Sequence, residues 1–265
     1  MSATLDRLLA ALAPAGLNAV GVLSAHTWDA RMPAAQRVAP LVAGAQQVVV
    51  VGSGGPALWR AFLADLEARP EHLVAEPHPL DAFVRRSVHA ASAALGDRPH
   101  RWVLSAANES IFLDFRMMAE MAGVGTRGRL GLLMHPVHGP WLGLRAACIV
   151  AGEVGPVSPP LTPSPCDGCP APCVTACPGA AFPQGRFSIG RCASFQGDSD
   201  ACALSCHSRR ACPAGAGSAY PVDEERYHTN RPVGRAELRR RLGIADAADP
   251  HAGEPLAWTR WVDGA

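Results

Sequence analysis

The chain has 265 residues, with 24 Lys and Arg against 23 Asp and Glu, giving a formal net charge of +1. This length can bury a substantial core, so a metal is not needed merely to hold a very small fold together. The balanced charge carries no global signature of a nucleic-acid or anionic-membrane binder, so any such partner would need a local patch.

The N-terminal 23 residues contain an acid and a base within their apolar stretch and are interrupted by Pro14 and Gly16. We therefore do not expect them to be a signal peptide. They predict an amphipathic helix with Thr4 as N-cap, followed by a strand. No later apolar run is long and charge-free enough to span a bilayer, so we expect a cytoplasmic protein without a membrane partner. In that reducing compartment, clustered cysteines more often bind metal or carry redox chemistry than form disulfides.

Up to about Val154, apolar runs alternate with helical stretches. Residues 46–55 predict a strand and a turn, and residues 56–68 a helix. Residues 78–95 and 114–125 predict two more helices, ended by Gly96 and Gly123. Within residues 129–154, two apolar runs flank Pro-Val-His-Gly-Pro, which predicts a hairpin of antiparallel strands. Cys148 lies in the second strand and is expected to be a core residue.

The composition changes at residues 155–165, "GPVSPPLTPSP", which predict a stiff, extended connector. Eight of the nine cysteines follow it, in a region poor in long apolar segments, whose order we expect to depend on metal. Residues 234–244 predict a short basic helix, either a local patch or a solvated face. The expected domains are 1–154, the connector 155–165, an iron–sulfur module 166–220, and a C-terminal segment 221–265 packing back on the first domain.

The cysteine spacing is typical of ligands for iron–sulfur clusters. Short spacers let successive thiolates wrap one face of a cubane, and a fourth cysteine followed by proline often turns away to the neighbouring cluster. The cysteines form two runs in the sequence, residues 166–177 and 192–212, and in each run the last cysteine is followed by proline. We therefore expect a ferredoxin-like module with two 4Fe-4S clusters. The expected ligands are Cys166, Cys169, Cys173 and Cys212 for one cluster, and Cys177, Cys192, Cys202 and Cys206 for the other.

Alternatives to two clusters stay open at this point. Three residues separate Cys169 from Cys173, where the strict bacterial pattern has two, which leaves the ligand pairing and the second cluster open. A pair of zinc sites needs similar ligands but usually comes as paired Cys-x-x-Cys knuckles, and one Cys-x-x-Cys occurs here. Disulfides are the third possibility. Iron–sulfur clusters are favoured over zinc sites and over disulfides.

The region before the connector resembles the corrinoid-binding core of epoxyqueuosine reductases. That family carries an Ala-Gly-Leu-Gly-Trp-x-Gly-Lys segment, an apolar strand, a turn and a second strand, followed by a two-cluster ferredoxin module. The similar residues here are Ala122–Gly125, Gly128-Arg129, Leu132 and Gly139–Leu144.

The chain is also similar to cobalamin-processing chaperones of the cobalamin C type. Their Ile-His-Pro and Gly-Gly-Trp-Phe-Ala-Ile-Arg-Gly runs look like Met134–Pro136 and Gly139–Arg145. Weaker similarities cover residues 52–59, 78–81 and 224–227. The shared order of these motifs carries the resemblance, which covers most of the chain.

The resemblance implies an α+β fold: a nitroreductase-like domain that binds cobalamin base-off, followed by the ferredoxin-like module. Base-off binding makes cobalt easier to reduce, and a cluster at the corrin edge could supply the electrons. His135 and Arg145 would line the corrin pocket, with Arg226 and Tyr227 near the upper face. The full set of implied cofactor-binding residues is Arg127, Gly128, His135, His138, Gly139, Trp141, Arg145, Arg226 and Tyr227.

The two families imply different reactions. Epoxyqueuosine reductases act on tRNA and use a carboxylic acid as proton donor; the corresponding position here is Glu109, without the surrounding motif. Arg129 stands in place of that family's lysine, and the near-zero net charge argues against tRNA.

We therefore expect a cytoplasmic corrinoid-binding iron–sulfur oxidoreductase that reduces cobalamin or reductively removes its upper ligand. Its expected partner is an external low-potential electron donor such as a ferredoxin, a flavodoxin or a reductase. The alternatives are an epoxyqueuosine reductase-like enzyme and a non-catalytic cobalamin chaperone.

Overall fold

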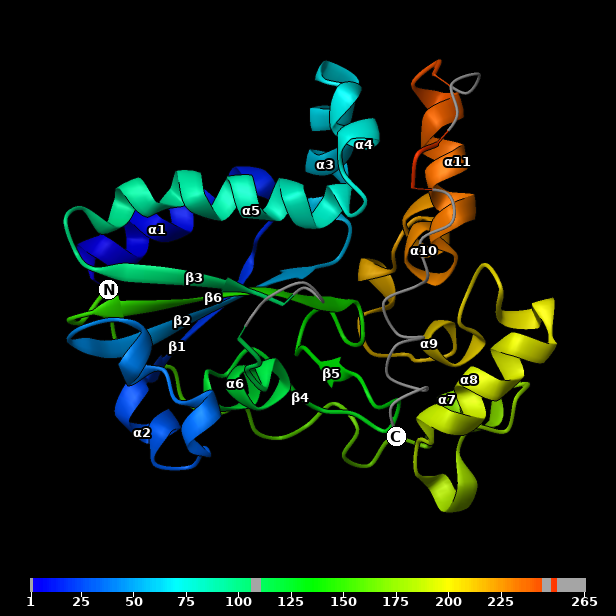
Figure 1. Cartoon of the computed structure of the whole chain (residues 1–265). Helices are drawn as coiled ribbons and strands as arrows, with labels where there is room; N and C mark the ends of the chain where they lie inside the picture. The colour runs from blue at the N-terminus through cyan, green and yellow to red at the C-terminus, as the bar shows by residue number, and fades with distance from the viewer. Residues whose placement is uncertain (1, 106–110, 245–248, 252–265) are drawn as a thin grey trace. The chain divides into compact units, whose positions relative to one another are not determined.

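The computed structural model describes residues 2–105, 111–244 and 249–251 (Figure 1). The chain divides into two compact units. Unit 1 comprises Met1–Phe62, Leu80–Thr126 and Leu142–Ser164, and unit 2 comprises Leu63–Pro79, Arg127–Trp141 and Pro165–Ala265. Each unit therefore combines segments that are far apart in the sequence, and the expected domain boundaries stay a prediction.

Unit 1 contains a four-stranded antiparallel sheet in the order β1-β2-β6-β3. The strands are β1 (Ala19–Ser24), β2 (Ala45–Gly54), β3 (His100–Leu104) and β6 (Leu142–Ala151). β2 and β6 occupy the centre, and Val48–Val51 and Ala146–Val150 are fully buried. Such continuous apolar runs are typical of strands covered on both faces. Cys148 lies among them, which confirms its expected place in the core, and burial raises the pKa of its thiol to about 12.

Helices cover both faces of this sheet, with α1 (Ala3–Leu12) and α5 (Pro79–Ala91) on one face and α2 (Ala25–Asp29) and α6 (Phe115–Met121) on the other (Figure 1). α3 (Ala57–Ala68) follows β2 as predicted, and its Trp59 and Phe62 rings pack 5.4 Å apart. α5 continues as a 3-10 turn to Leu95 before Gly96. Asp114 is the N-cap of α6, and its carboxylate accepts from the Met117 amide; Gly123, with φ +65°, follows the helix. The three predicted helices of this region are confirmed.

The start of α1 differs from the prediction. Ser2, not Thr4, is the N-cap, because the Asp6 amide already bonds to the Ser2 carbonyl, 3.0 Å away. Thr4 is buried inside the first turn, where its hydroxyl accepts a 3.4 Å bond from Arg7.

The predicted hairpin is wrong in its pairing. The first apolar run forms β5 (Leu133–Met134), which pairs with β4 (Thr126–Arg127), while the second run forms β6 between β2 and β3. One antiparallel bridge, His135 with Gly139, closes the turn between them. Pro140 has no amide hydrogen with which to extend this ladder.

The Pro-rich connector is bonded to the sheet of unit 1. The Ser158 amide donates to the Val22 carbonyl over 2.8 Å, and the Val22 amide donates back to the Ser158 hydroxyl over 3.0 Å. Buried Gln47 donates to the Gly155 carbonyl and accepts from the Val154 amide, each over 2.8 Å. The prolines make the segment extended, and these side chains fix it in place.

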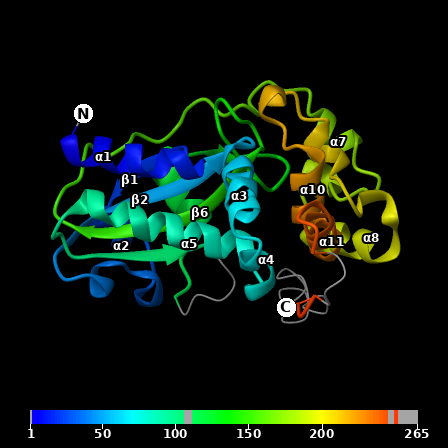
Figure 2. The same cartoon turned by 90° about the horizontal axis from the view of Figure 1, so that it is seen from above.

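Apart from β5, the described part of unit 2 is formed mainly by short helices joined by irregular segments. They are α4 (Glu71–Ala75), α7 (Pro172–Thr175), α8 (Ile189–Asp198), α9 (His207–Arg210), α10 (Val222–Thr229) and α11 (Arg231–Arg241). α10 and α11 pack against each other (Figures 1 and 2). A Cβ on Gly234 would lie 2.4 Å from the Tyr227 Cα, so this close approach requires glycine.

The predicted basic helix is α11, but its arginines do not form a simple solvated face. Arg235 and Arg239 are buried. The Arg235 guanidinium forms two 2.9 Å bonds to the Asp249 carboxylate and also donates to the carbonyls of Leu73 and Glu76, each over 3.0 Å. These bonds satisfy a charge that would otherwise be too costly to bury.

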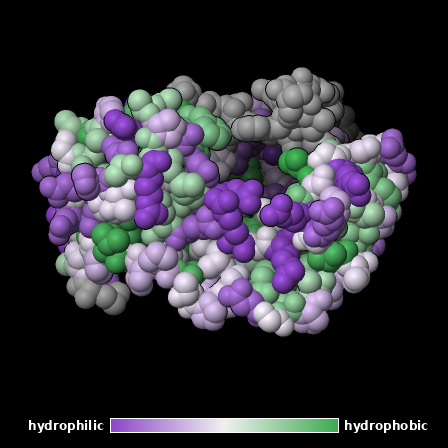
Figure 3. Space-filling view, turned by 90° about the horizontal axis from the view of Figure 1, so that it is seen from below, coloured by the Kyte–Doolittle hydropathy of each residue, from purple (hydrophilic) through white to green (hydrophobic). Residues whose placement is uncertain are grey.

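The surface in Figure 3 intersperses hydrophilic and hydrophobic residues. Within the described part of the chain, no helix combines the length and apolarity needed to traverse a bilayer.

Candidate metal centre

The eight cysteines that follow the connector separate into two groups, both within unit 2. Burial raises the pKa of the Cys173 thiol, and the nearby thiols of Cys212, Cys166 and Cys169 raise it further. Burial also raises the pKa of Cys212, with Cys166 and Cys169 again among its neighbours. The structure therefore brings together Cys166, Cys169, Cys173 and Cys212, which we name group 1.

The other four thiols form group 2: Cys177, Cys192, Cys202 and Cys206. Burial raises the pKa of the Cys192 thiol, and Cys206, Cys177 and Cys202 raise it further. The same effects act on Cys202, from burial and then from Cys206 and Cys177. Cys177 thus lies with group 2, although its neighbours in the sequence belong to group 1. Cys212 lies with group 1, although its neighbours in the sequence belong to group 2. Whether the two groups ligate metal stays a prediction.

Local backbone conformation makes the thiols of group 1 converge. Gly168, between Cys166 and Cys169, has φ +70°, and the Cys169 amide bonds back to the Cys166 carbonyl over 3.3 Å. Ala171 adopts φ +57° immediately before α7, which begins at Pro172 and carries Cys173. The Cys-x-x-Cys turn and this short helix thus accompany the close approach of Cys166, Cys169 and Cys173.

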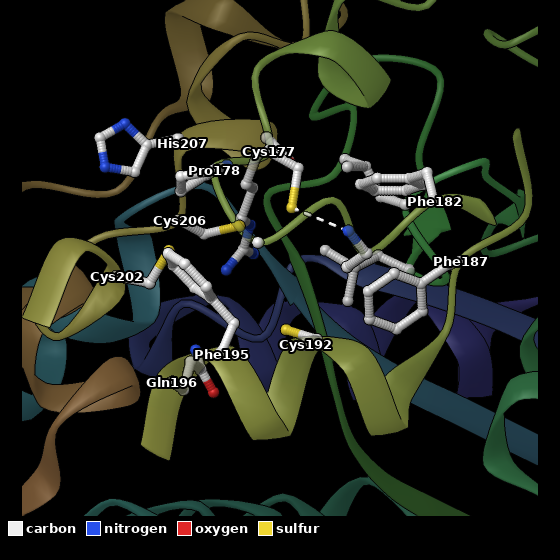
Figure 4. A pocket seen from close by; sticks show the side chains of 16 residues that line it. Cys177, Pro178, Phe182, Phe187, Cys192, Phe195, Gln196, Cys202, Cys206 and His207 are labelled. Carbon is white, nitrogen blue, oxygen red and sulfur yellow. Dashed lines mark hydrogen bonds between the residues drawn. The ribbon is translucent and has the colours of Figure 1, made fainter. Parts of the chain in front are cut away.

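Backbone amides point at several of the sulfurs. The Ala171 amide lies 3.5 Å from the Cys169 Sγ and the Ala181 amide 3.4 Å from the Cys177 Sγ (Figure 4). Amides of His207 and Ala214 likewise lower the pKa of Cys202 and Cys212, against the raising effect of burial. Such donors stabilise thiolates and metal-bound sulfurs, and they tune cluster potentials.

Group 2 surrounds a cavity of about 210 Å³. In Figure 4 the four cysteine side chains border this space, with the aromatic rings of Phe182, Phe187 and Phe195 beside them. The lining is largely apolar and its softest donors are the thiols. That donor set suits a thiolate-bound metal and excludes the oxygen-rich coordination of magnesium or calcium.

Among residues 2–105, 111–244 and 249–251, no three His, Cys, Asp or Glu side chains converge closely enough to hold one metal ion. In a cubane cluster each thiolate binds a different iron, so the sulfurs lie around the cluster instead of meeting at one atom. Two sets of four thiols in largely apolar surroundings, with amides directed at the sulfurs, fit that kind of group.

Group 1 packs against the segment Arg127–Trp141, which carries six of the nine predicted ligand-binding residues. Leu130 and Met134 of this segment are buried in one apolar cluster with Cys173, Cys212 and Phe182. Gly128 permits that packing, because a Cβ there would lie 2.5 Å from the Met134 Cγ. Arg127, next to it, is exposed on β4.

The two predicted histidines stabilise the turn that follows Met134. The His135 Nδ1 accepts from the amides of Val137 and His138, at 3.1 and 3.2 Å, and the two imidazole rings lie 4.7 Å apart. Burial, and then the His138 charge, lower the pKa of His135 to about 4. Burial also lowers the pKa of His138, whose Nδ1 lies 2.8 Å from the Ser218 hydroxyl. His135 is therefore neutral at pH 7.

Gly139 brings this turn against the chain that follows Cys212. It has φ +54°, and a Cβ there would lie 2.0 Å from the Ala214 carbonyl oxygen. Because the Ala214 amide also donates to the Cys212 thiol, Ala214 links the turn to a cysteine of group 1.

Arg209 connects the same turn to group 2, and sequence reasoning missed it. Its guanidinium lies 4.5 Å from the Trp141 ring centroid and 4.6 Å from that of Tyr220, and it donates to the Pro140 carbonyl over 2.8 Å. Arg209 also lines the group 2 cavity. Trp141 is buried beneath it. The arginine pair directly after Cys206-His207-Ser208 gives no signal of this stacking.

The remaining predicted residues lie elsewhere, and their ligand roles stay predictions. Arg145, on β6 of unit 1, donates to the Ser53 hydroxyl over 2.9 Å. On α10, Arg226 pairs with Glu237 over 2.7 Å, and Tyr227 is buried beneath Gly234. Glu109, the predicted proton donor, lies outside the described residues.

No protein-family model matches the sequence, and no curated protein matches it either. Solved structures do. Epoxyqueuosine reductase from Streptococcus thermophilus aligns with a TM-score of 0.55 at 13% identity, over 91% of this chain and 80% of that one. The Bacillus subtilis enzyme gives 0.55 at 15% identity, over 98% and 84%. The B12-trafficking protein CblC from C. elegans gives 0.58 at 12% identity, over 90% and 95%.

These likenesses establish the fold. The chain has the mixed helix and sheet architecture shared by epoxyqueuosine reductases and the B12-trafficking protein. The resemblance that the sequence motifs indicated is thus confirmed at the level of the fold.

Proposed function

We propose that this chain is a corrinoid-binding iron–sulfur oxidoreductase that reduces the cobalt of cobalamin or reductively removes its upper axial ligand. One observation carries the proposal: the segment Arg127–Trp141, which resembles a corrinoid-binding core, is packed directly on the cysteine groups through Met134, Gly139 and Arg209. The fold likeness to two reductases and to a B12-trafficking protein supports it.

Each cysteine group would hold one 4Fe-4S cluster in a ferredoxin-like module. Bound there, the clusters supply one-electron transfer at low potential. The thiolates bind the irons, the amides of Ala171 and Ala181 stabilise the charge on sulfur, and Leu130 and Phe182 exclude water. An external low-potential donor, such as a ferredoxin, a flavodoxin or a reductase, would deliver the electrons in a reducing, cytoplasmic compartment.

Cobalamin is the substrate in this proposal. The turn His135–Gly139 would offer neutral imidazoles, which carry no positive charge to repel a cationic metal centre at pH 7. Gly139 lets the backbone approach Ala214 closely, which sets the turn beside Cys212. Arg145, held by Ser53, would bind a polar group of the corrin periphery.

The clusters are tested by anaerobic reconstitution followed by assays of iron and acid-labile sulfide. We expect roughly eight irons per chain in the wild type and roughly four in Cys173→Ser and in Cys202→Ser, which each remove a thiol from one group. Cys148→Ala is the matched control, since Cys148 is buried in β6 of unit 1. Retention of the full iron content in both variants would contradict the ligand assignment.

Corrinoid binding is tested by titrating the reconstituted protein with cob(II)alamin and following the visible spectrum. The proposal predicts a saturable shift to the base-off form at about one corrinoid per chain. The absence of a spectral shift at any protein excess would show that the chain does not bind the corrinoid.

A second candidate is an epoxyqueuosine reductase-like reaction on a modified base or another small reducible substrate, favoured by the fold likeness to two such enzymes. Glu109 would be its proton donor, so Glu109→Gln should abolish turnover in that case. A third candidate, a non-catalytic cobalamin chaperone, is favoured by the likeness to CblC. It predicts base-off binding without any transfer of electrons from the clusters.

A further inference from the structure

α10 carries two adjacent carboxylates that are almost completely buried. Glu224 is 1% exposed and Glu225 is 2% exposed. Buried carboxylates are rare in proteins unless a partner compensates their charge. The partners of Glu225 lead directly to group 2.

The first partner is a group 2 cysteine. The Glu225 Oε1 accepts a 3.1 Å hydrogen bond from the backbone amide of Cys206. Cys206 is the N-cap of α9, so its amide has no partner within that helix, and Glu225 supplies one. Only the Cα and Cβ atoms lie between this nitrogen and the sulfur. The carboxylate is therefore fixed against the residue that would bind iron.

The second partner is Arg210, at the end of α9. Its guanidinium forms an ion pair with the other Glu225 oxygen, and its backbone amide donates to the Cys206 carbonyl over 3.0 Å. Cys206, Arg210 and Glu225 thus form a closed ring of interactions. The Arg210 side chain is 39% exposed, while that of Glu225 is 3% exposed.

Because of this difference in exposure, the negative charge of Glu225 acts more strongly on group 2 than the positive charge of Arg210 does. Water screens the Arg210 charge more than the Glu225 charge, and interactions of buried charges are less attenuated. Reduction adds negative charge to a cluster, which a nearby carboxylate opposes and a nearby guanidinium favours. Net charge near a cluster and hydrogen bonds to its ligands are among the factors that set its potential.

We infer that the Glu225–Arg210 ion pair sets the reduction potential of the cluster held by group 2. Glu225 and Arg210 act through Cys206 and the local field, so they are positioning residues. The inference rests on the proposed function, because it requires a cluster in group 2.

A purely structural role is the competing explanation, since the same contacts also hold α10 on α9. Loss of either partner would then loosen the site in the same way. The electrostatic role predicts opposite effects from the two partners. Glu225→Gln keeps the shape and removes the negative charge, so the group 2 potential should become more positive. Arg210→Gln removes the positive charge and should make it more negative, whereas Arg210→Lys should stay close to the wild type.

The experiment is a potentiometric titration of the reconstituted full chain, followed by electron paramagnetic resonance. Glu237→Gln is the matched control, because Glu237 pairs with Arg226, the residue next to Glu225 on α10. We expect opposite shifts of one of two redox transitions in Glu225→Gln and Arg210→Gln, and no shift in the control.

Two results would overturn the inference: unchanged potentials in both variants, or shifts of the same sign. If Glu225→Gln does not fold, the comparison of Arg210→Gln with Arg210→Lys still decides, because the two differ in the charge on a partly exposed side chain. The iron content of the wild type distinguishes failure of this inference from failure of the proposed iron–sulfur function. A wild type without iron refutes both, while a wild type with two clusters and unmoved potentials refutes only the inference.

Discussion

The two units of the molecule achieve order by different means. Unit 1 is organised by a sheet whose central strands, β2 and β6, are apolar along Val48–Val51 and Ala146–Val150. Unit 2 has short helices, thiols that share two sites, and buried charges such as Arg235 and Glu225. Apolar burial stabilises a fold without regard to redox state or pH, whereas thiol and ionic contacts depend on both.

The largest expected difference between the units follows removal of iron. Because metal binding to thiolates contributes folding free energy, on the order of 10 kcal/mol for structural zinc sites, we expect chelation to open α8 and α9 but leave the sheet intact. Hydrogen exchange measures this directly: amides of α8 and α9 should lose protection while those of β2 and β6 keep it. Equal loss in both units would contradict the comparison.

A core truncation in unit 1 should have the next largest effect. Phe62 is fully buried between Trp59 and Phe83, so Phe62→Ala should destabilise the protein by about 3–5 kcal/mol. Chemical denaturation gives this value, and it should be the same with and without iron. Val157→Ala, at a position 51% exposed, is the control and should change stability by less than about 0.5 kcal/mol.

Two glycines with similar backbone angles provide a test with smaller expected changes in stability and a matched control. Gly139 has φ +54° and no room for a Cβ, whereas Gly152 has φ +75° and nothing within 4 Å. Gly152→Ala should cost about 1 kcal/mol from backbone strain alone, and Gly139→Ala about 2–4 kcal/mol because it also displaces Ala214. Denaturation curves and iron content measure both. Equal costs, with iron retained, would show that the turn and the Cys212 segment are not tightly coupled.

The last prediction concerns the ion pair between Arg235 and Asp249 in unit 2. Hydrogen bonds from Arg235 hold the pKa of Asp249 at about 2, against an ordinary value of 3.8. A depressed pKa means that the stabilisation is complete above about pH 4 and is lost as the pH falls toward 2. Asp249→Asn should therefore cost about 2 kcal/mol, equally at pH 7 and pH 5. A cost that shrinks between pH 7 and pH 5 would place the pKa of Asp249 much higher.

Sequence reasoning succeeded where one local signal decides the structure. The apolar run Val48–Val51 specified a strand, and Gly96 and Gly123 specified helix ends. The expected grouping of the cysteines, with proline after Cys177 and Cys212, agrees with the thiols that lie near one another in unit 2, and their role as metal ligands stays a prediction.

It failed where the partner lies far away in the sequence. The pairing of β6 with β2 and β3 depends on strands about 40 to 100 residues earlier, which a turn motif at Gly139 does not report. The burial of Arg235 depends on Leu73 and Asp249, and the stacking of Arg209 depends on Trp141. Arginine runs look solvated in a sequence because the groups that compensate them are not adjacent.

The most direct test of the proposed function is a single reduction of bound cobalamin. Anaerobic protein carrying cob(II)alamin is treated with a low-potential reductant, and the visible spectrum is followed in the wild type and in Cys173→Ser. We expect cob(I)alamin to form in the wild type and to form much more slowly in the variant, because group 1 packs on the segment that would bind the corrinoid. Bound cob(II)alamin that persists while the clusters are fully reduced would contradict this expectation and favour a chaperone.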